Sequence, residues 1–131
     1  AIHTAYDSSH IYDDCIILEQ KVSVGFDVLN DVFDGKTGKL IYTYASSKEA
    51  AEYYNVDYRG VRETRYGQGL FVASSVPDVE DARGHQPYGY MDKYGNMVIP
   101  AVFEEANAFS NGYAWVKYNG LWGMIKLPQG V

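Results

Sequence analysis

Paired carboxylates are the residues of this chain that could most directly do chemistry, because two neighbouring acids can serve as general acid and general base. Two pairs occur, Asp13-Asp14 and Glu104-Glu105. Adjacent residues in a strand point to opposite faces of a sheet, so neither pair forms a dyad by itself. We therefore expect neither pair to act as a catalytic site on its own. A hydrolase would have to gather its acids from separate segments. The candidates for such a site are Asp78, Asp81, Glu104 and Glu105.

Metal ligation and nucleophilic catalysis have less support in the sequence. His3, His10 and His85 are scattered, without the spacing of four that places two ligands on one helix face. Cys15 begins an apolar run and is expected to be a small buried residue. No serine lies in a nucleophile elbow, and Gly67-Gln68-Gly69 lacks the rest of a phosphate-binding fingerprint. We predict no catalytic residue, no metal site and no cofactor.

A basic segment is the next candidate. Residues 58–66 interleave Arg59, Arg62 and Arg65 with tyrosines, a combination that can hold phosphates and stack bases. However, a glutamate lies among the arginines, and residues 1–34 carry seven acidic residues against one lysine. We expect the arginines to pair with acids of this chain or of a second copy, and we predict no nucleic-acid partner.

Aromatic side chains are the best candidates for binding, because tyrosine and tryptophan give rigid, amphipathic contact area at low entropic cost. The candidates are Tyr113, Trp115 and Trp122 on a predicted hairpin, with Tyr53 and Tyr54 on a predicted helix. The alternatives are that the tryptophans form a core between repeats and that the tyrosines pack the helix on a sheet.

The composition is that of one folded domain, residues 1–131. The chain has 131 residues, of which 47% are hydrophobic and 21% charged, which is too apolar for a disordered chain. No run approaches the roughly 20 apolar residues of a membrane span. The formal net charge of −6 argues against wholesale phosphate binding, and 13 tyrosines beside 13 glycines favour β structure with many turns. Because the chain begins at Ala1, we expect a processed or excised form.

The clearest local element is a hairpin at Asn119-Gly120, since this dipeptide between apolar runs favours a type I′ turn. The turn predicts a register in which these residues face each other: Tyr118 and Leu121, Lys117 and Trp122, Val116 and Gly123, Trp115 and Met124, Ala114 and Ile125. Neither face is polar, so the hairpin requires cover on both sides. Gly123 would leave a gap in which an aromatic side chain from a neighbouring unit could lie.

Other segments predict further strands and one helix. Strands at 88–91 and 96–99 flank a turn at 92–95, and Pro100 is expected to end the second strand. Alternation over 22–28 predicts another strand, continued at Leu40 after a turn.

A helix is predicted from Ser47 to Tyr54, with Ser46 and Glu49 as a capping box and Asn55 as the stop. Ala50, Tyr53 and Tyr54 are expected to share one side of it. Residues 74–87 are predicted to form a long loop.

Residues 88–126 resemble the WG repeat, or KWG repeat, of bacterial proteins. The residues that carry the resemblance are Tyr88-Gly89-Tyr90-Met91-Asp92-Lys93, Val98-Ile99-Pro100, Phe103-Glu104-Glu105-Ala106, Phe109-Ser110-Asn111-Gly112 and Asn119-Gly120-Leu121-Trp122-Gly123. Leu121 departs from the usual Lys and Lys126 from the usual Asp. The resemblance implies repeated β-hairpins, an interaction role without catalytic residues, and a secreted or cell-envelope location, with a cytoplasmic one left open.

The predicted fold is all-β to α+β, with repeated antiparallel hairpins or meanders and one short inserted helix at about 47–54. The expected repeat units are 13–66, 66–112 and an incomplete 112–131. The predicted function is a non-catalytic binding or scaffolding module for a protein or a cell-envelope glycan or peptide. The alternatives are the gathered-carboxylate hydrolase and a purely structural segment of a longer repeat array. Self-association through an open C-terminal strand edge is also expected to be available.

Overall fold

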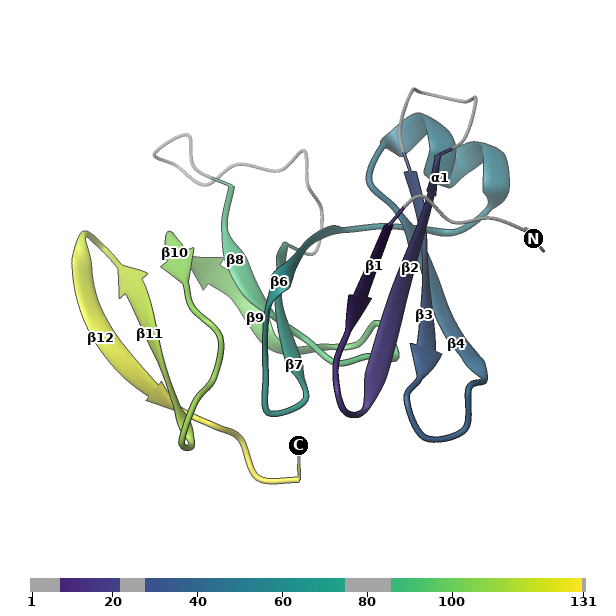
Figure 1. Cartoon of the computed structure of the whole chain (residues 1–131). Coiled ribbons are helices and arrows are strands. Elements are labelled where there is room, and N and C mark those ends of the chain that lie inside the picture. The colour runs from purple at the N-terminus through teal and green to yellow at the C-terminus, as the bar shows by residue number, and fades with distance from the viewer. Residues whose placement is uncertain (1–7, 22–27, 75–85, 131) are drawn as a thin grey trace. The chain divides into compact units, whose positions relative to one another are not determined.

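The computed structural model describes residues 8–21, 28–74 and 86–130. The chain divides into two compact units, Ala1–Arg59 and Gly60–Val131, which are described one at a time (Figure 1). The single domain and the three repeat boundaries expected from the sequence stay predictions. Among the described residues no helix has the length and apolar character needed to cross a membrane.

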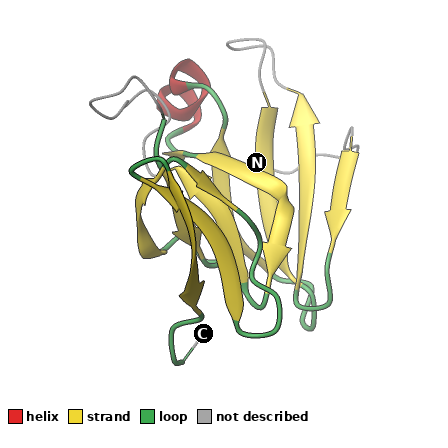
Figure 2. Cartoon of the chain, turned by 90° about the vertical axis from the view of Figure 1, so that its left-hand side faces the viewer, coloured by secondary structure: helices red, strands yellow, loops and turns green. Residues whose placement is uncertain are grey.

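Strands make up most of the described residues in both units (Figure 2), and the predicted β-rich fold with one short helix is confirmed. The elements of the first unit are β1 (Ser8–Ile11), β2 (Cys15–Lys21), β3 (Val28–Asp34), β4 (Leu40–Ala45), α1 (Lys48–Tyr54) and β5 (Asp57–Tyr58). Those of the second unit are β6 (Gly60–Gly67), β7 (Leu70–Ser74), β8 (Tyr88–Met91), β9 (Met97–Phe103), β10 (Glu105–Ala106), β11 (Tyr113–Tyr118) and β12 (Leu121–Lys126).

The first unit is one sheet in the order β1-β2-β3-β4-β5, antiparallel except for the β4–β5 pair. Cys15 is fully buried, as predicted. Most of the strand predicted at 22–28 lies outside the described residues, and β3 begins at its last position. The continuation at Leu40 is confirmed as the start of β4.

Helix α1 and its N-cap each lie one residue later than predicted. Its N-cap is Ser47, whose Oγ accepts a hydrogen bond from the Ala50 amide at 3.2 Å, so the capping box based on Ser46 is wrong. Two serines stand side by side in the sequence, and the second is the one in extended conformation. Asn55 ends the helix in the left-handed region at φ 56°, as predicted.

The buried side of α1 also differs from the prediction. Ala50 and Ala51 are buried together with Leu29 and Ala45, and Tyr54 packs at the margin of this cluster. Tyr53 is 71% exposed. The apolar side of this short helix is thus made by two small alanines, which bring its backbone close to the sheet.

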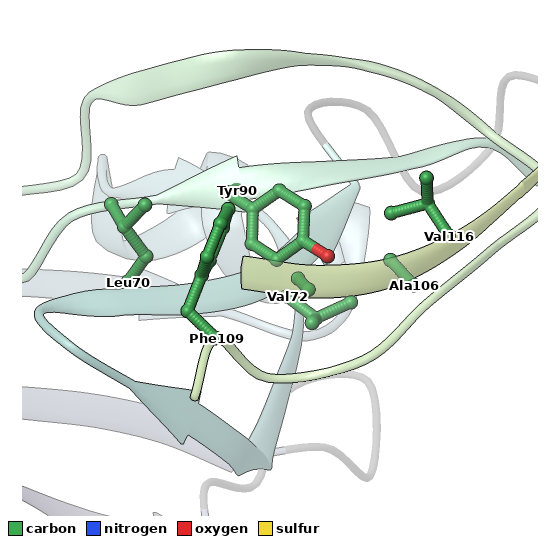
Figure 3. Close-up of a cluster of buried hydrophobic side chains, with 7 residues drawn as sticks. Leu70, Val72, Tyr90, Ala106, Phe109 and Val116 are labelled. Atoms are coloured by element: carbon green, nitrogen blue, oxygen red, sulfur yellow. The ribbon is translucent and has the colours of Figure 1, made fainter. Parts of the chain in front are cut away.

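The second unit consists of two antiparallel sheets, β6-β7-β8-β9 and β10-β11-β12. Its core is a cluster of side chains from both sheets and from the turn before β11, partly shown in Figure 3. The buried members are Leu70, Val72, Tyr90, Ala106, Phe109, Ala114 and Val116. The core of this unit therefore lies between β7–β8 on one side and β10–β11 on the other.

The turn at 92–95 and strand β8 have the predicted bounds, but β9 does not end at Pro100 and continues to Phe103. The proline is tolerated because β9 pairs only with β8 in its sheet and because the register of that pair shifts there. Gly89 of β8 lies next to this irregular stretch, where an added Cβ would collide with the Ile99 carbonyl oxygen. The long loop predicted at 74–87 lies largely outside the described residues.

Candidate binding surface

The β11–β12 hairpin forms around a tight turn with two positive φ angles, 50° at Asn119 and 77° at Gly120. Positive φ at both positions is what a type I′ turn requires, and this turn matches the twist of the strands. The resulting register is the predicted one in every pair from Tyr118–Leu121 to Ala114–Ile125. The carboxylate of Glu104 accepts a hydrogen bond from the Gly120 amide at 2.7 Å and so holds the turn.

Side chains alternate along the two strands and divide the hairpin into two faces. The inner face carries Ala114 and Val116, which are 2% and 3% exposed, with Ile125 packed beside them in the core. The opposite face we call the outer face. It consists of Tyr113 (45% exposed), Trp115 (52%), Trp122 (54%) and Met124 (52%). The hairpin therefore covers the core with one face and presents the other to solvent.

Two lysines accompany the aromatic side chains of the outer face. Lys117 pairs with Trp122 in the register, and Lys126 pairs with Tyr113. Each cross-strand pair thus sets an amino group beside a large ring, and Glu105 of β10 is the register partner of Lys117 on its other side. Large half-exposed aromatic rings are enriched in the contact sites of protein interfaces.

The outer face contains three of the residues predicted for binding, Tyr113, Trp115 and Trp122. Met124 was not among the predicted residues, although the register that the Asn119-Gly120 turn imposes sets it opposite Trp115. Its thioether adds a flexible apolar patch between the rings. The predicted register already sets Met124 on the same face as Trp115 and Trp122, but only the aromatic residues were predicted to bind.

The three arginines predicted for binding each have contacts within their own unit. In the first unit the Arg59 Nε donates to the Tyr42 hydroxyl at 3.3 Å, and its guanidinium lies 3.9 Å from the Asp57 carboxylate. Burial raises the pKa of the Tyr42 hydroxyl, so this phenol stays neutral between the two charged groups.

In the second unit Arg62 lies over the ring of Tyr88, with 5.2 Å from its guanidinium carbon to the ring centroid, and also donates to the Tyr88 hydroxyl. Arg65 Nη1 donates to the Ala106 carbonyl at 3.1 Å and lies 3.7 Å from the Glu105 carboxylate. Both arginines thus extend from β6 to residues of later strands.

The two tyrosines predicted on the helix have different environments. Tyr53 is exposed, Tyr54 is half-buried, and their rings meet edge to face at a centroid distance of 4.9 Å. With Arg59 they belong to the first unit, whereas Arg62, Arg65 and the hairpin aromatics belong to the second. Within the second unit only the hairpin aromatics share one face.

The carboxylates of Glu104 and Glu105 have structural contacts. Glu104 accepts a hydrogen bond from the Gly120 amide of the turn, and Glu105 lies 3.7 Å from Arg65. At the other pair, it is the backbone carbonyl of Asp14 that accepts a hydrogen bond, from the Gly35 amide at 2.9 Å. Asp78 and Asp81, the other acids of the alternative hydrolase site, lie outside the described residues.

Comparison with known proteins identifies one segment. Residues 88–122 match the family model described as WG containing repeat, which confirms the resemblance for the segment from β8 into β12. No curated protein and no solved structure matches the chain. The chain thus contains a repeat module whose last matched residue, Trp122, is part of the outer face.

Proposed function

We propose that this chain, with its WG repeat at residues 88–122, is a non-catalytic protein-binding module in a secreted or cell-envelope setting. Its contact surface is the outer face of the β11–β12 hairpin. The partner is a protein that covers Tyr113, Trp115, Trp122 and Met124.

The observation that carries the proposal is the exposure of four large side chains on one face of a regular hairpin, each between 45% and 54% accessible. Rings that lie half in water leave apolar area available for burial, and each Å² covered contributes roughly 25 cal/mol. The backbone that presents them is rigid, because the opposite face is anchored in the core through Ala114 and Val116. A partner therefore meets a preformed surface and orders little of this chain on binding.

Charge contributes less to this proposal than the aromatic rings do. Lys126 lies beside Tyr113, but Lys117 is paired with Glu105 of β10 in the register, so the rim of the face carries charges of both signs. An envelope glycan is the alternative ligand, since sugar rings also stack on aromatic faces.

Site-specific photo-crosslinking tests the proposal in cells that produce the protein. A benzophenone amino acid replaces Trp122 in one variant and Tyr94 in a matched control, because Tyr94 is also about half exposed but lies on the turn between β8 and β9. We expect a discrete protein adduct from position 122 and none from position 94. The adduct should disappear when Trp115 is also changed to serine.

Fluorescence titration with soluble muropeptides distinguishes a glycan ligand from a protein partner. Both tryptophans of the chain lie on the outer face, so a ligand bound there changes their emission directly. A saturable change with muropeptides, together with no protein adduct at position 122, would replace the proposed partner by a glycan. Equal adducts at positions 122 and 94 would also contradict the proposal.

A further inference from the structure

The two hairpins of the second unit, β7–β8 and β11–β12, have the same register. Residues at corresponding positions pair in the same way: Ala73–Gly89 corresponds to Val116–Gly123, Val72–Tyr90 to Trp115–Met124, and Phe71–Met91 to Ala114–Ile125. The turns that lead into the two hairpins also agree. Gln68 and Gly69 have φ angles of 52° and 87°, and Asn111 and Gly112 have 53° and 84°. The second hairpin is therefore a structural repeat of the first.

The face of the first hairpin that corresponds to the outer face is covered within the molecule. It carries Leu70, Val72 and Tyr90, which are fully buried. The side chains that cover it come from the inner face of the second hairpin, from β10 and from the turn before β11, and are Ala106, Phe109, Ala114 and Val116. The second repeat thus covers the first with small aliphatic side chains and one aromatic ring.

Tyr90 shows how this cover is made (Figure 3). Its ring lies against Phe109 at a centroid distance of 4.7 Å, and its hydroxyl donates to the Asn107 carbonyl at 2.7 Å. The position of Tyr90 in the second hairpin is held by Met124, and the position of Val72 is held by Trp115. The Val72–Tyr90 pair and the Trp115–Met124 pair therefore each contain one aromatic and one aliphatic side chain. The aromatic residue is on the second strand in the first pair and on the first strand in the other.

From this correspondence we infer that the outer face is a docking surface for the inner face of a further WG-type hairpin repeat. The inference rests on the proposed function and names the class of partner. The partner offers small aliphatic side chains in the manner of Ala106, Ala114 and Val116, and an aromatic ring in the manner of Phe109. It packs on Trp115 and Met124 as the second repeat packs on Val72 and Tyr90.

Charge does not determine this partner. In the contact within the molecule, Arg65 of β6 lies 3.7 Å from Glu105 of the covering repeat. The positions of Lys117 and Lys126 are held in the first hairpin by Ser74 and Asp92, and Lys117 is paired with Glu105 of β10 in the register. The inference therefore rests on the apolar side chains of the two corresponding faces.

A second copy of this chain is a poor occupant. Its inner face, Ala114 and Val116, is already buried in its own core. The other side of its first hairpin carries Phe71, Ala73 and Met91, each 0% exposed. Among the described residues of the two hairpins, a second copy therefore has no open inner face to offer, and the occupant must be a different repeat.

A tandem protein tests the inference. It consists of residues 1–125 followed by a second copy of residues 92–131, so that Ile125 takes the place of Met91 before the turn. Trp115 and Trp122 are changed to phenylalanine in the appended copy only. Because the chain has two tryptophans, all emission then reports on the original outer face.

We expect the appended repeat to shift the emission to shorter wavelength and to lower the acrylamide quenching constant by up to about two-fold. Most of this change comes from Trp115, which takes the position of the buried Val72, because Trp122 takes the position of Tyr88, which is only partly buried. Trp115 is larger than Val72, so a second tandem protein carries Val116→Ala in the appended copy to make room. The matched control carries Ala114→Lys and Val116→Lys in the appended copy and should be quenched like the unmodified chain.

Circular dichroism of each tandem protein measures whether the appended repeat forms strands. Appended strands with unprotected tryptophans in both tandem proteins would overturn the inference, and so would failure of the appended repeat to fold. Sedimentation equilibrium of the unmodified chain adds a third outcome. A dimer that Trp122→Lys abolishes would make a second copy the occupant and overturn it as well.

These results are separable from a failure of the proposed function. A tandem protein without protection, combined with a protein adduct at position 122, rejects the repeat as partner and keeps the protein-binding face. Protected tryptophans without any adduct in cells keep the docking geometry and reject binding to a separate protein.

Discussion

The β7–β8 hairpin and the β11–β12 hairpin have one register and opposite surroundings. Val72 and Tyr90 are 0% exposed, whereas Trp115 and Met124 at the corresponding positions are both 52% exposed. The backbone of the two hairpins is the same in kind, so the difference lies in what covers them. Large apolar side chains at equivalent positions thus form core in one repeat and surface in the next.

The glycines of the two hairpins show the same contrast. Gly89 lies next to the irregular stretch of β9, where an added Cβ would meet backbone atoms of Ile99 and Pro100. Gly123 has no atom within 4 Å of an added Cβ. The predicted gap at Gly123 is present, but in the first hairpin the backbone of the neighbouring strand β9 fills the corresponding place and not an aromatic ring. An aromatic-glycine pair therefore allows close backbone packing where a neighbouring strand with an irregular register runs beside it.

The largest expected difference in stability is between substitutions at Tyr90, which is covered, and at Met124, which is exposed at the corresponding position. Tyr90→Ala should lower the free energy of unfolding of the second unit by about 3–5 kcal/mol, since it removes a buried ring from the core. Met124→Ala should change it by no more than about 0.5 kcal/mol, as for an ordinary surface residue. Urea unfolding followed by tryptophan emission measures both. Equal effects would mean that the two hairpins are equally covered.

Much of this arrangement could be predicted from local sequence. Asn119-Gly120 determines the turn and, through the turn, every pair of the second hairpin. Asn55 determines the end of α1, because its left-handed conformation suits few other residues. These features depend on a few neighbouring residues and on backbone geometry alone.

Other features depend on contacts between distant segments, and the neighbouring residues in the sequence do not predict them. The choice of Ser47 over Ser46 as the cap follows from how α1 packs its alanines on the sheet. The passage of β9 beyond Pro100 follows from the position of that strand at a sheet edge. Whether Trp115 and Trp122 form core or surface depends on the presence of a covering repeat, which their own alternation does not reveal.

A smaller effect is expected at the glycines. Gly89→Ala should lower the free energy of unfolding by about 1–3 kcal/mol, because the new methyl group would force Ile99 and Pro100 of β9 away. Gly123→Ala, the matched control, should remain within about 0.5 kcal/mol of the unmodified chain. Thermal unfolding of both variants gives the comparison. A large loss at Gly123 would show that its surroundings are as crowded as those of Gly89.

The hydroxyl of Tyr90 has no counterpart on Met124, and its ionisation makes the stability of the second unit depend on pH. Burial raises the pKa of Tyr90 to about 12, while the charge of Arg65 acts in the lowering direction. The raised pKa in the folded state means that neutral Tyr90 contributes stability below pH 10, the ordinary pKa, and that this contribution is lost as the pH rises towards 12.

Tyr90→Phe should therefore cost about 1 kcal/mol at pH 7, the value of the hydrogen bond to Asn107. The variant should also lose less stability than the unmodified chain between pH 10 and 12. Urea unfolding followed by tryptophan emission across that range tests this in the second unit. An unchanged alkaline slope would show that Tyr90 does not titrate with folding.

The smallest effect is expected for the ion pair between the two repeats. Arg65 and Glu105 lie 3.7 Å apart with side chains 41% and 51% exposed, so solvent screens their attraction. Glu105→Gln should lower the free energy of unfolding by less than about 0.5 kcal/mol, and the difference should shrink further in high salt. Arg65 keeps its hydrogen bond to the Ala106 carbonyl in the variant.

The comparison of Glu105→Gln with Tyr90→Ala decides what holds one repeat on the next. If the ion pair were worth as much as the tyrosine ring, charge would select the covering repeat, and the outer face could bind any acidic surface through Lys117 and Lys126. Instead, we expect the loss of unfolding free energy in Tyr90→Ala to be several-fold larger than that in Glu105→Gln. The shape and apolar character of the covering face, and not its charge, then determine which repeat can cover it. Charge then only orients a partner that the face of Trp115 and Met124 recognises by packing.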